Sequence, residues 1–289
     1  MYPASFTYVA PRSLEEALDL LTRLSGEAKL LAGGHSLIPA MKLRLSEPGS
    51  LIDLGRVPEL AGVRVDGETL VIGALTVHAD LAESPLVRQH LPGLADAASL
   101  IGDVQVRNRG TIGGSAAHAD PGADEPVILT ALDATFALAS ANGRRFVQAD
   151  EFFTGFFTTA LAPNEILTEV RIPIPPRNVA TAYAKLGHPA SGYVLVSAGA
   201  LVRRAPNGAF ESARIALGGL GGGPTRARGV EEALQGAPVT PDAIAAAASR
   251  AAEGTDPDDD PYASAEYKRH LATVLARRAI ESAVARLPA

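Results

Sequence analysis

The first fifty residues combine one helical hydrophobic pattern with short extended ones. Apolar side chains at positions 14, 17, 18, 21 and 24 fall on one face of a helix. Ser13 and Glu16 form the capping-box pattern that begins such a helix. Apolar runs at residues 28–31 and 51–54 predict two strands. This part of the chain therefore predicts an α/β unit.

From about residue 58 the pattern changes to short strands separated by turn residues. Asp66-Gly67 and Asn142-Gly143 each lie between two apolar runs and predict a β-hairpin. Thr76 is the expected N-cap of a helix that runs through residue 81, and residues 91–101 predict an amphipathic helix.

A strand over residues 165–172 precedes a cluster of three prolines. Proline cannot continue a strand ladder, so we expect a domain boundary there. Just upstream, four phenylalanines gather in a short stretch and are expected to be core residues; they are Phe152, Phe153, Phe156 and Phe157.

The last third of the chain predicts three strands followed by three helices. The strands are expected at 183–186, 193–203 and 211–217, and the helices at 231–234, 241–253 and 264–286. The glycine-rich residues 218–223 read as a connector. Strands followed by helices indicate an antiparallel sheet with helices on one face. The sequence thus predicts an α+β fold, divided at residues 1–55, 56–176 and 177–289.

Composition and charge restrict the function classes. Hydrophobic residues make up 47% of the 289 residues, an ordinary value for a globular protein. The net charge of −6 argues against a nucleic-acid surface, which is normally basic. No run of eighteen apolar residues occurs and the first residues do not resemble a signal peptide, so we expect a cytoplasmic protein without a membrane span.

Cysteine is absent from the sequence. This excludes disulfides, a thiolate nucleophile and thiolate-ligated iron–sulfur clusters in this chain. The six histidines form no H-x-x-x-H pair, so no metal site is expected. If the protein transfers electrons through iron–sulfur clusters, those clusters belong to another chain.

Two glycine pairs carry the strongest chemical signal. In K-L-L-A-G-G-H-S, residues 29–36, a short apolar run ends in two glycines, and T-I-G-G-S follows at residues 111–115. Glycine loops expose main-chain N–H groups that suit phosphate oxygens. We therefore predict that the two loops hold one diphosphate, with help from the Ser36, Thr111 and Ser115 hydroxyls. The alternative is that each pair is an ordinary turn.

Other polar residues near these loops have more than one interpretation. His35 is expected to donate to a phosphate or to lie beside a ring system, unless it is a structural histidine. Asp120 and Asp124 suit ribose or ribityl hydroxyls. Asp124 is alternatively the N-cap of a helix that starts near Pro126.

The chain resembles a known family through several motifs. They are A-G-G-H-S at 32–36, T-I-G-G-S at 111–115, A-D-x-x-A-D-E-P at 119–126 and S-A-E-Y-K-R-H-L at 264–271. Together they resemble the FAD-binding medium subunit of molybdenum hydroxylases, a family that includes the carbon monoxide dehydrogenase medium chain and the flavin domain of xanthine dehydrogenase. The resemblance covers essentially the whole chain. It implies a two-part FAD-binding domain of the PCMH type, followed by a smaller domain of the CO dehydrogenase flavoprotein C-terminal type.

The resemblance also implies a set of residues around FAD. Asp124, Leu167 and Lys185 match flavin-site positions, although the bare pattern would make Lys185 a solvated lysine on an edge strand. Ile101 replaces an aromatic flavin contact, and Tyr193 follows Ser191-Gly192 where related chains often have Gly-Asp-Tyr. The full predicted set comprises Lys29, Leu30, Leu31, Ala32, Gly33, Gly34, His35, Ser36, Ile101, Thr111, Ile112, Gly113, Gly114, Ser115, Asp120, Asp124, Leu167, Lys185 and Tyr193.

The function that the resemblance implies is electron transfer. FAD in this chain would receive electrons from [2Fe-2S] clusters on a small subunit. Those electrons would come from a molybdenum cofactor on a large subunit, and an external acceptor would receive them. The expected assembly is a dimer of such heterotrimers. Two alternatives stay open: a stand-alone FAD-dependent oxidase or reductase of the same fold, and a non-catalytic nucleotide-binding protein.

Overall fold

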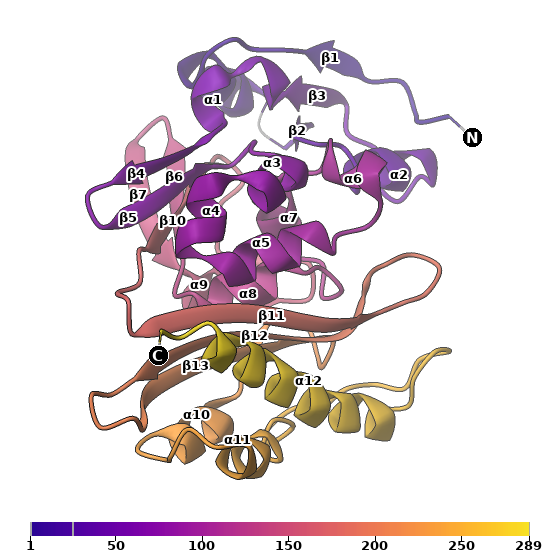
Figure 1. The fold of residues 1–289 in the computed structure, drawn as a ribbon. Helices are drawn as coiled ribbons and strands as arrows, with labels where there is room; N and C mark the ends of the chain where they lie inside the picture. The colour runs from indigo at the N-terminus through magenta and orange to yellow at the C-terminus, as the bar shows by residue number, and fades with distance from the viewer. Residues whose placement is uncertain (1, 25, 289) are drawn as a thin grey trace.

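The computed structural model describes residues 2–24 and 26–288, in which three main sheets follow one another along the chain (Figure 1). The first lies at the N-terminal end, and the third lies between the central helices and the three C-terminal ones. The structure confirms the predicted α+β class. The proposed boundaries at residues 55 and 176 stay a prediction.

The first sheet is parallel and has the order β1-β3-β2. Its strands are β1 (Thr7–Val9), β2 (Ala28–Leu31) and β3 (Ser50–Asp53). Helix α1 (Leu14–Arg23) buries Ala17 and Leu21 against the sheet in one core cluster with Ile52. Ser13 caps α1 as predicted, because its Oγ accepts a hydrogen bond from the Glu16 N–H. Helix α2 (Leu37–Lys42) starts where the first glycine loop ends.

The second sheet is antiparallel, with the order β4-β5-β10-β6-β7. These strands are β4 (Val63–Asp66), β5 (Thr69–Gly73), β10 (Ile166–Pro173), β6 (Thr135–Ser140) and β7 (Gly143–Gln148). Both predicted hairpins form. A cluster of buried apolar side chains joins the sheet to helices on its inner side. The helices are α3 (His78–Glu83), α4 (Pro85–His90), α5 (Pro92–Ser99), α7 (Ile112–His118) and α8 (Glu125–Ala131).

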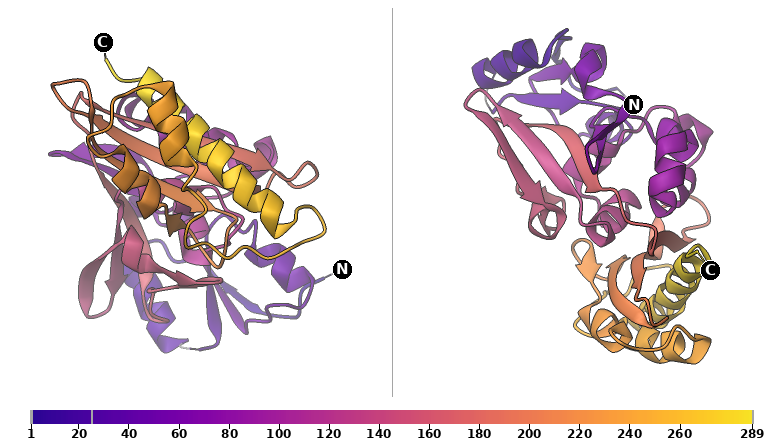
Figure 2. Two further views of the ribbon diagram at one scale, coloured as in Figure 1. Left: turned by 90° about the horizontal axis from the view of Figure 1, so that it is seen from below. Right: turned by 60° about the vertical axis from the view of Figure 1, so that its left-hand side comes forward.

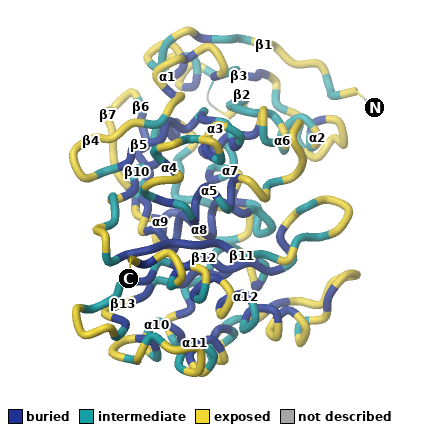
Figure 3. The backbone as a smooth tube through the Cα atoms, viewed as in Figure 1, coloured by how far each residue is buried: buried dark blue, intermediate teal, exposed yellow. Residues whose placement is uncertain are grey.

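The third sheet has the order β11-β12-β13-β14 and is antiparallel. Its strands are β11 (Val179–Gly187), β12 (Val194–Arg204), β13 (Phe210–Gly218) and β14 (Thr225–Arg226). One face packs against α10 (Arg228–Leu234), α11 (Pro241–Ala248) and α12 (Ala265–Ala285), while α5 and α8 contact the other (Figure 2). Much of β11 and β12 is therefore buried (Figure 3).

Some local predictions were wrong. Thr76 does not cap α3; its hydroxyl binds the main chain of Gly62 instead. Only part of the phenylalanine group is core, because Phe152 is fully buried but Phe156 is 67% exposed. Short helices that were not predicted occupy α6 (Val104–Arg107) and α9 (Ala149–Phe152). Short local segments of this kind carry too few apolar positions to show a period.

Candidate functional site

The two glycine loops lie against each other in the folded chain. A β-carbon built on Gly33 would lie 2.2 Å from the Arg109 carbonyl oxygen and 2.7 Å from the Gly110 α-carbon. A β-carbon on Gly114 would lie 3.5 Å from the Ala32 β-carbon. The structure thus brings together two segments that are almost eighty residues apart in the sequence.

The first loop presents a row of unused main-chain donors. Gly34 has a φ of +78°, a left-handed conformation that favours glycine. Within the described residues, the N–H groups of Gly33, Gly34, His35 and Ser36 form no hydrogen bond. The His35 ring is exposed, with Nδ1 3.1 Å from the Gly33 carbonyl oxygen. Consecutive free N–H groups of this kind can bind a phosphate.

The second glycine pair has a different role from the one expected. Gly113 and Gly114 lie in the first turn of α7. The Gly113 N–H donates to the Ala74 carbonyl oxygen at 2.8 Å, and the Gly114 N–H donates to Thr111 Oγ1 at 3.1 Å. The prediction that both N–H groups are free for phosphate is therefore wrong. A β-carbon on Gly113 would lie 2.4 Å from that of Ala74, so this glycine permits close packing. The Ser115 hydroxyl makes no hydrogen bond to any described residue.

Asp124 forms the centre of a buried polar group. Its Oδ1 accepts a hydrogen bond from the Tyr183 hydroxyl (2.9 Å) and lies 2.8 Å from Lys185 Nζ. Burial raises the pKa of Asp124 to about 6, although Lys185 and Tyr183 oppose the rise. Asp124 occupies the N-cap position of α8, as the alternative interpretation predicted, but its side chain makes no capping hydrogen bond.

Lys185 is held inside the protein. Its side chain is only 7% exposed, so the interpretation as a solvated edge lysine is wrong, although β11 is an edge strand. Besides Asp124, the ammonium donates to the Leu100 and Gly192 carbonyl oxygens at 2.7 and 2.9 Å. Lys185 thereby ties the segment before Ile101 to the segment before Tyr193.

Tyr193 connects the third sheet to the first glycine loop. Its hydroxyl lies beside the side chain of Ser36, and burial together with the charge of Asp120 raises its pKa. A β-carbon on Gly122 would lie 3.2 Å from Tyr193 Cδ1 and 3.4 Å from Asp120 Oδ1. Asp120 and Tyr193 are therefore neighbours, and the Tyr193 hydroxyl reaches the loop that carries the free N–H groups.

The remaining predicted residues differ in how deeply they are buried. Leu167 is buried in β10, where the next residue, Thr168, accepts a hydrogen bond from Ala74, the residue on which Gly113 rests. Ile101 is half-buried beside Leu100. In β2, Leu30 and Leu31 are half-buried and Lys29 is exposed. Thr111 and Ile112 are buried at the start of α7.

Two buried residues near the second glycine pair were not among the predicted site residues. His78 Nδ1 lies 2.8 Å from Glu125 Oε1, and neither residue is more than 5% exposed. Burial lowers the pKa of His78, but the carboxylates of Glu125 and Asp124 outweigh this effect and raise it. Glu125 belongs to the A-D-x-x-A-D-E-P motif, whereas no sequence signal marks His78.

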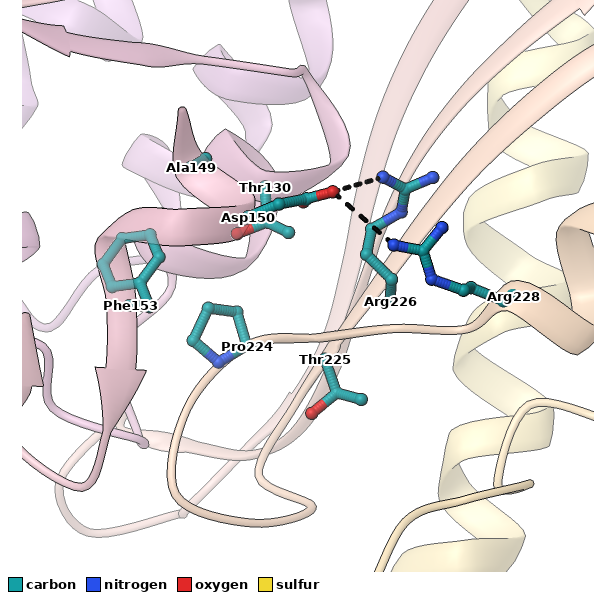
Figure 4. A pocket seen from close by; sticks show the side chains of 8 residues that line it. All are labelled: Thr130, Ala149, Asp150, Phe153, Pro224, Thr225, Arg226 and Arg228. Atoms are coloured by element: carbon teal, nitrogen blue, oxygen red, sulfur yellow. Dashed lines mark hydrogen bonds and ion pairs between the residues drawn. The ribbon is translucent and has the colours of Figure 1, made fainter. Parts of the chain in front are cut away.

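A separate polar hollow lies where α8 and α9 meet β14 and α10. It measures about 290 Å³ (Figure 4). Asp150 points into it and lies 3.1 Å from Arg226 and 3.9 Å from Arg228. None of the predicted site residues lines it. We assign it to the ionic contact between the central helices and the third sheet.

Comparison with known proteins identifies the family. Residues 4–175 match the family described as "FAD binding domain in molybdopterin dehydrogenase", and residues 181–283 match "CO dehydrogenase flavoprotein C-terminal domain". This chain belongs to the FAD-binding subunits of the molybdopterin dehydrogenases. The resemblance seen in the sequence is confirmed, and FAD is the cofactor of the chain.

This chain matches its relatives along essentially the whole length of both proteins. The carbon monoxide dehydrogenase medium chain of Hydrogenophaga pseudoflava is 44% identical over 99% of both chains. The glyceraldehyde dehydrogenase medium chain of Sulfolobus acidocaldarius is 38% identical over 97% of this chain and 99% of its own. A solved structure of carbon monoxide dehydrogenase from H. pseudoflava superimposes with a TM-score of 0.95, at 45% identity and full coverage of both chains.

Two kinds of feature are absent from the residues that the structure describes. Among them, no helix is long and apolar enough to cross a bilayer. No cluster of three or more histidine, aspartate or glutamate side chains in the same part of the chain could hold a metal ion.

Proposed function

We propose that this chain is the electron-transfer subunit of a molybdenum-containing hydroxylase of the carbon monoxide dehydrogenase type. It relays electrons from [2Fe-2S] clusters of a small subunit, through FAD, to an external acceptor. The observation that carries the proposal is the row of free N–H groups at Gly33–Ser36, which lies directly against the segment that leads into α7. A diphosphate is the ligand that such a donor set fits.

The donor chemistry of the site fits FAD. The N–H groups of residues 33–36 and the Ser115 hydroxyl would hold the diphosphate, and Asp120 would accept hydrogen bonds from sugar or ribityl hydroxyls. Lys185, Ile101 and Tyr193 lie on the segments that would border the ring system. Bound FAD supplies the redox chemistry, since it accepts and releases electrons singly or in pairs. The residues of this chain bind FAD, orient it and limit its access to water.

The absence of cysteine supports the placement of the iron–sulfur clusters on a different subunit. A chain without cysteine cannot ligate an iron–sulfur cluster through thiolates. We therefore infer a small iron–sulfur subunit and a large molybdenum subunit as partners, assembled as a dimer of heterotrimers. We place the complex in the cytoplasm. The substrate is oxidised at the molybdenum of the large subunit, so residues of this chain do not select it.

Purification of the native complex tests this proposal. The chain should co-purify with two further subunits, with FAD, iron, acid-labile sulfide and molybdenum in fixed ratios. The chain alone, loaded with FAD, should oxidise no organic substrate, and activity should appear when both partners are added. Turnover by the single chain at about 1 per second or more would instead support a stand-alone flavoenzyme. Purification of a colourless chain that never binds FAD would contradict both readings.

A further inference from the structure

A buried histidine–glutamate pair lies directly behind the second glycine segment. His78 begins α3, and its main-chain N–H donates to the Gly110 carbonyl at 3.0 Å. Val77 forms an isolated β-bridge with Thr111. On the other side of the imidazole, Nδ1 lies 2.8 Å from Oε1 of Glu125, the first residue of α8. One residue thus connects α8 to the turn that precedes α7.

Gly110 is enclosed between this histidine and the first glycine loop. A β-carbon on Gly110 would lie 2.6 Å from His78 Nε2. A β-carbon on Gly33 would lie 2.7 Å from the Gly110 α-carbon, so the first loop packs against the same residue. The imidazole of His78 therefore supports the backbone against which the row of free N–H groups rests.

We propose that His78 and Glu125 are positioning residues that fix the spacing of the two glycine segments and so hold the diphosphate site open for FAD. The inference rests on the proposed function only in taking the diphosphate of FAD as the ligand. Neither side chain needs to touch FAD, because both act through Gly110. A shift of this backbone by less than 1 Å would misdirect several N–H groups at once, since hydrogen bonds weaken steeply with geometry.

The charged groups around His78 and Glu125 indicate that this pair interacts electrostatically and does not only fill space in the core. Glu125 is fully buried, and its Oε2 forms no hydrogen bond with the described residues. A buried carboxylate at the first position of a helix is favoured by the helix dipole and needs a cation nearby. The charged groups that face His78 are Glu125 from α8, Asp124 at the N-cap position before α8, and Arg107 from α6. The two carboxylates favour the imidazolium, and Arg107 opposes it.

Substitution of each partner tests the proposal, with the full chain in the form in which it purifies. His78→Gln keeps a donor for Glu125 but removes the ring that supports Gly110, and Glu125→Gln keeps the shape but removes the charge. We expect each variant to raise the dissociation constants of FAD and of ADP about tenfold or more. His270→Gln, on the exposed side of α12, is the matched control and should leave both constants unchanged.

The pH profile separates positioning from simple stabilisation. The raised pKa of His78 means that the imidazolium is favoured at low pH and lost as pH rises through that pKa. Wild-type affinity for ADP should therefore fall as pH rises through the pKa of His78. The His78→Gln variant should not show this fall. The inference is wrong if both variants bind ADP with wild-type affinity. It is also wrong if both variants keep the wild-type pH profile of ADP binding and differ only in a lower melting temperature. A wild-type chain that binds neither FAD nor ADP would overturn the proposed function instead.

Discussion

Gly33 packs so closely against Gly110 that a β-carbon on Gly33 would lie 2.7 Å from the Gly110 α-carbon. Real β-carbons do not approach other atoms to this distance without displacing them. The contact joins the loop after β2 to the turn before α7, and no flexible side chain lies between them to absorb a change. The proposed diphosphate site therefore depends on two glycines that meet backbone to backbone.

Gly33→Val should abolish FAD retention while leaving a folded chain. The new side chain would push the first loop away from Arg109 and Gly110, and would move the free N–H groups out of line with the second segment. The ratio of flavin absorbance to protein measures the effect. Gly223→Ala is the control, because a β-carbon there meets nothing within 4 Å and its φ is not left-handed. Full flavin loading of Gly33→Val would show that the loop is an ordinary turn.

Asp124→Asn should remove part of the pH dependence of folding stability. Burial raises the pKa of Asp124 from its ordinary value of 3.8 to about 6, so between these values the folded state holds a proton that the unfolded state releases. The free energy of unfolding should fall as pH rises across this window, by an amount on the order of 3 kcal/mol. Denaturant titrations from pH 4 to pH 7 measure the slope.

The slope for Asp124→Asn should be flatter than that of wild type across the same window. Asp242→Asn, at an exposed position in the first turn of α11, should keep the wild-type slope. Equal slopes for wild type and Asp124→Asn would show that the carboxyl titrates in the same way in the folded and unfolded chain.

Tyr183→Phe should destabilise the chain with or without FAD. The phenol is buried and donates to Asp124 Oδ1 at 2.9 Å, so the variant leaves that carboxylate with one donor fewer. Loss of a buried hydrogen bond to a charged group costs about 1.5–3 kcal/mol. Tyr262→Phe, at a position that is 66% exposed, should be neutral in the same unfolding experiment. An unchanged midpoint for Tyr183→Phe would contradict the assigned bond.

Arg226→Met should weaken folding much more than Arg228→Met. The Arg226 guanidinium binds both carboxylate oxygens of Glu231 at 2.7 Å and also reaches Asp150 at 3.1 Å, with its side chain only 10% exposed. Breaking a buried pair on one side costs about 3–5 kcal/mol. Arg228 is 68% exposed and lies 3.9 Å from Asp150, so its loss should change stability by under about 1 kcal/mol. Thermal unfolding of both variants tests this difference.

Much of the secondary structure could be predicted because it depends on local order. The period of apolar residues locates α1, α5 and α12, and turn dipeptides locate the hairpins between β4 and β5 and between β6 and β7. The glycine pairs with their neighbouring hydroxyls, together with the family motifs, indicated a diphosphate-binding flavoprotein. The absence of cysteine excluded thiolate-ligated iron–sulfur clusters in this chain. These properties follow from residue type and spacing, which the sequence states directly.

The tertiary structure decided which donors are free and which charges are buried. The sequence treats both glycine pairs alike, but packing against Ala74 and capping by Thr111 consume the N–H groups of Gly113 and Gly114. Lys185 and Asp124 are far apart in sequence, and only the fold brings β11 to the residue before α8 and makes them a buried pair. His78 meets Glu125 because the fold brings the start of α3 to the start of α8. Burial, hydrogen-bond competition and pKa depend on neighbours from distant segments, so local spacing could not determine them.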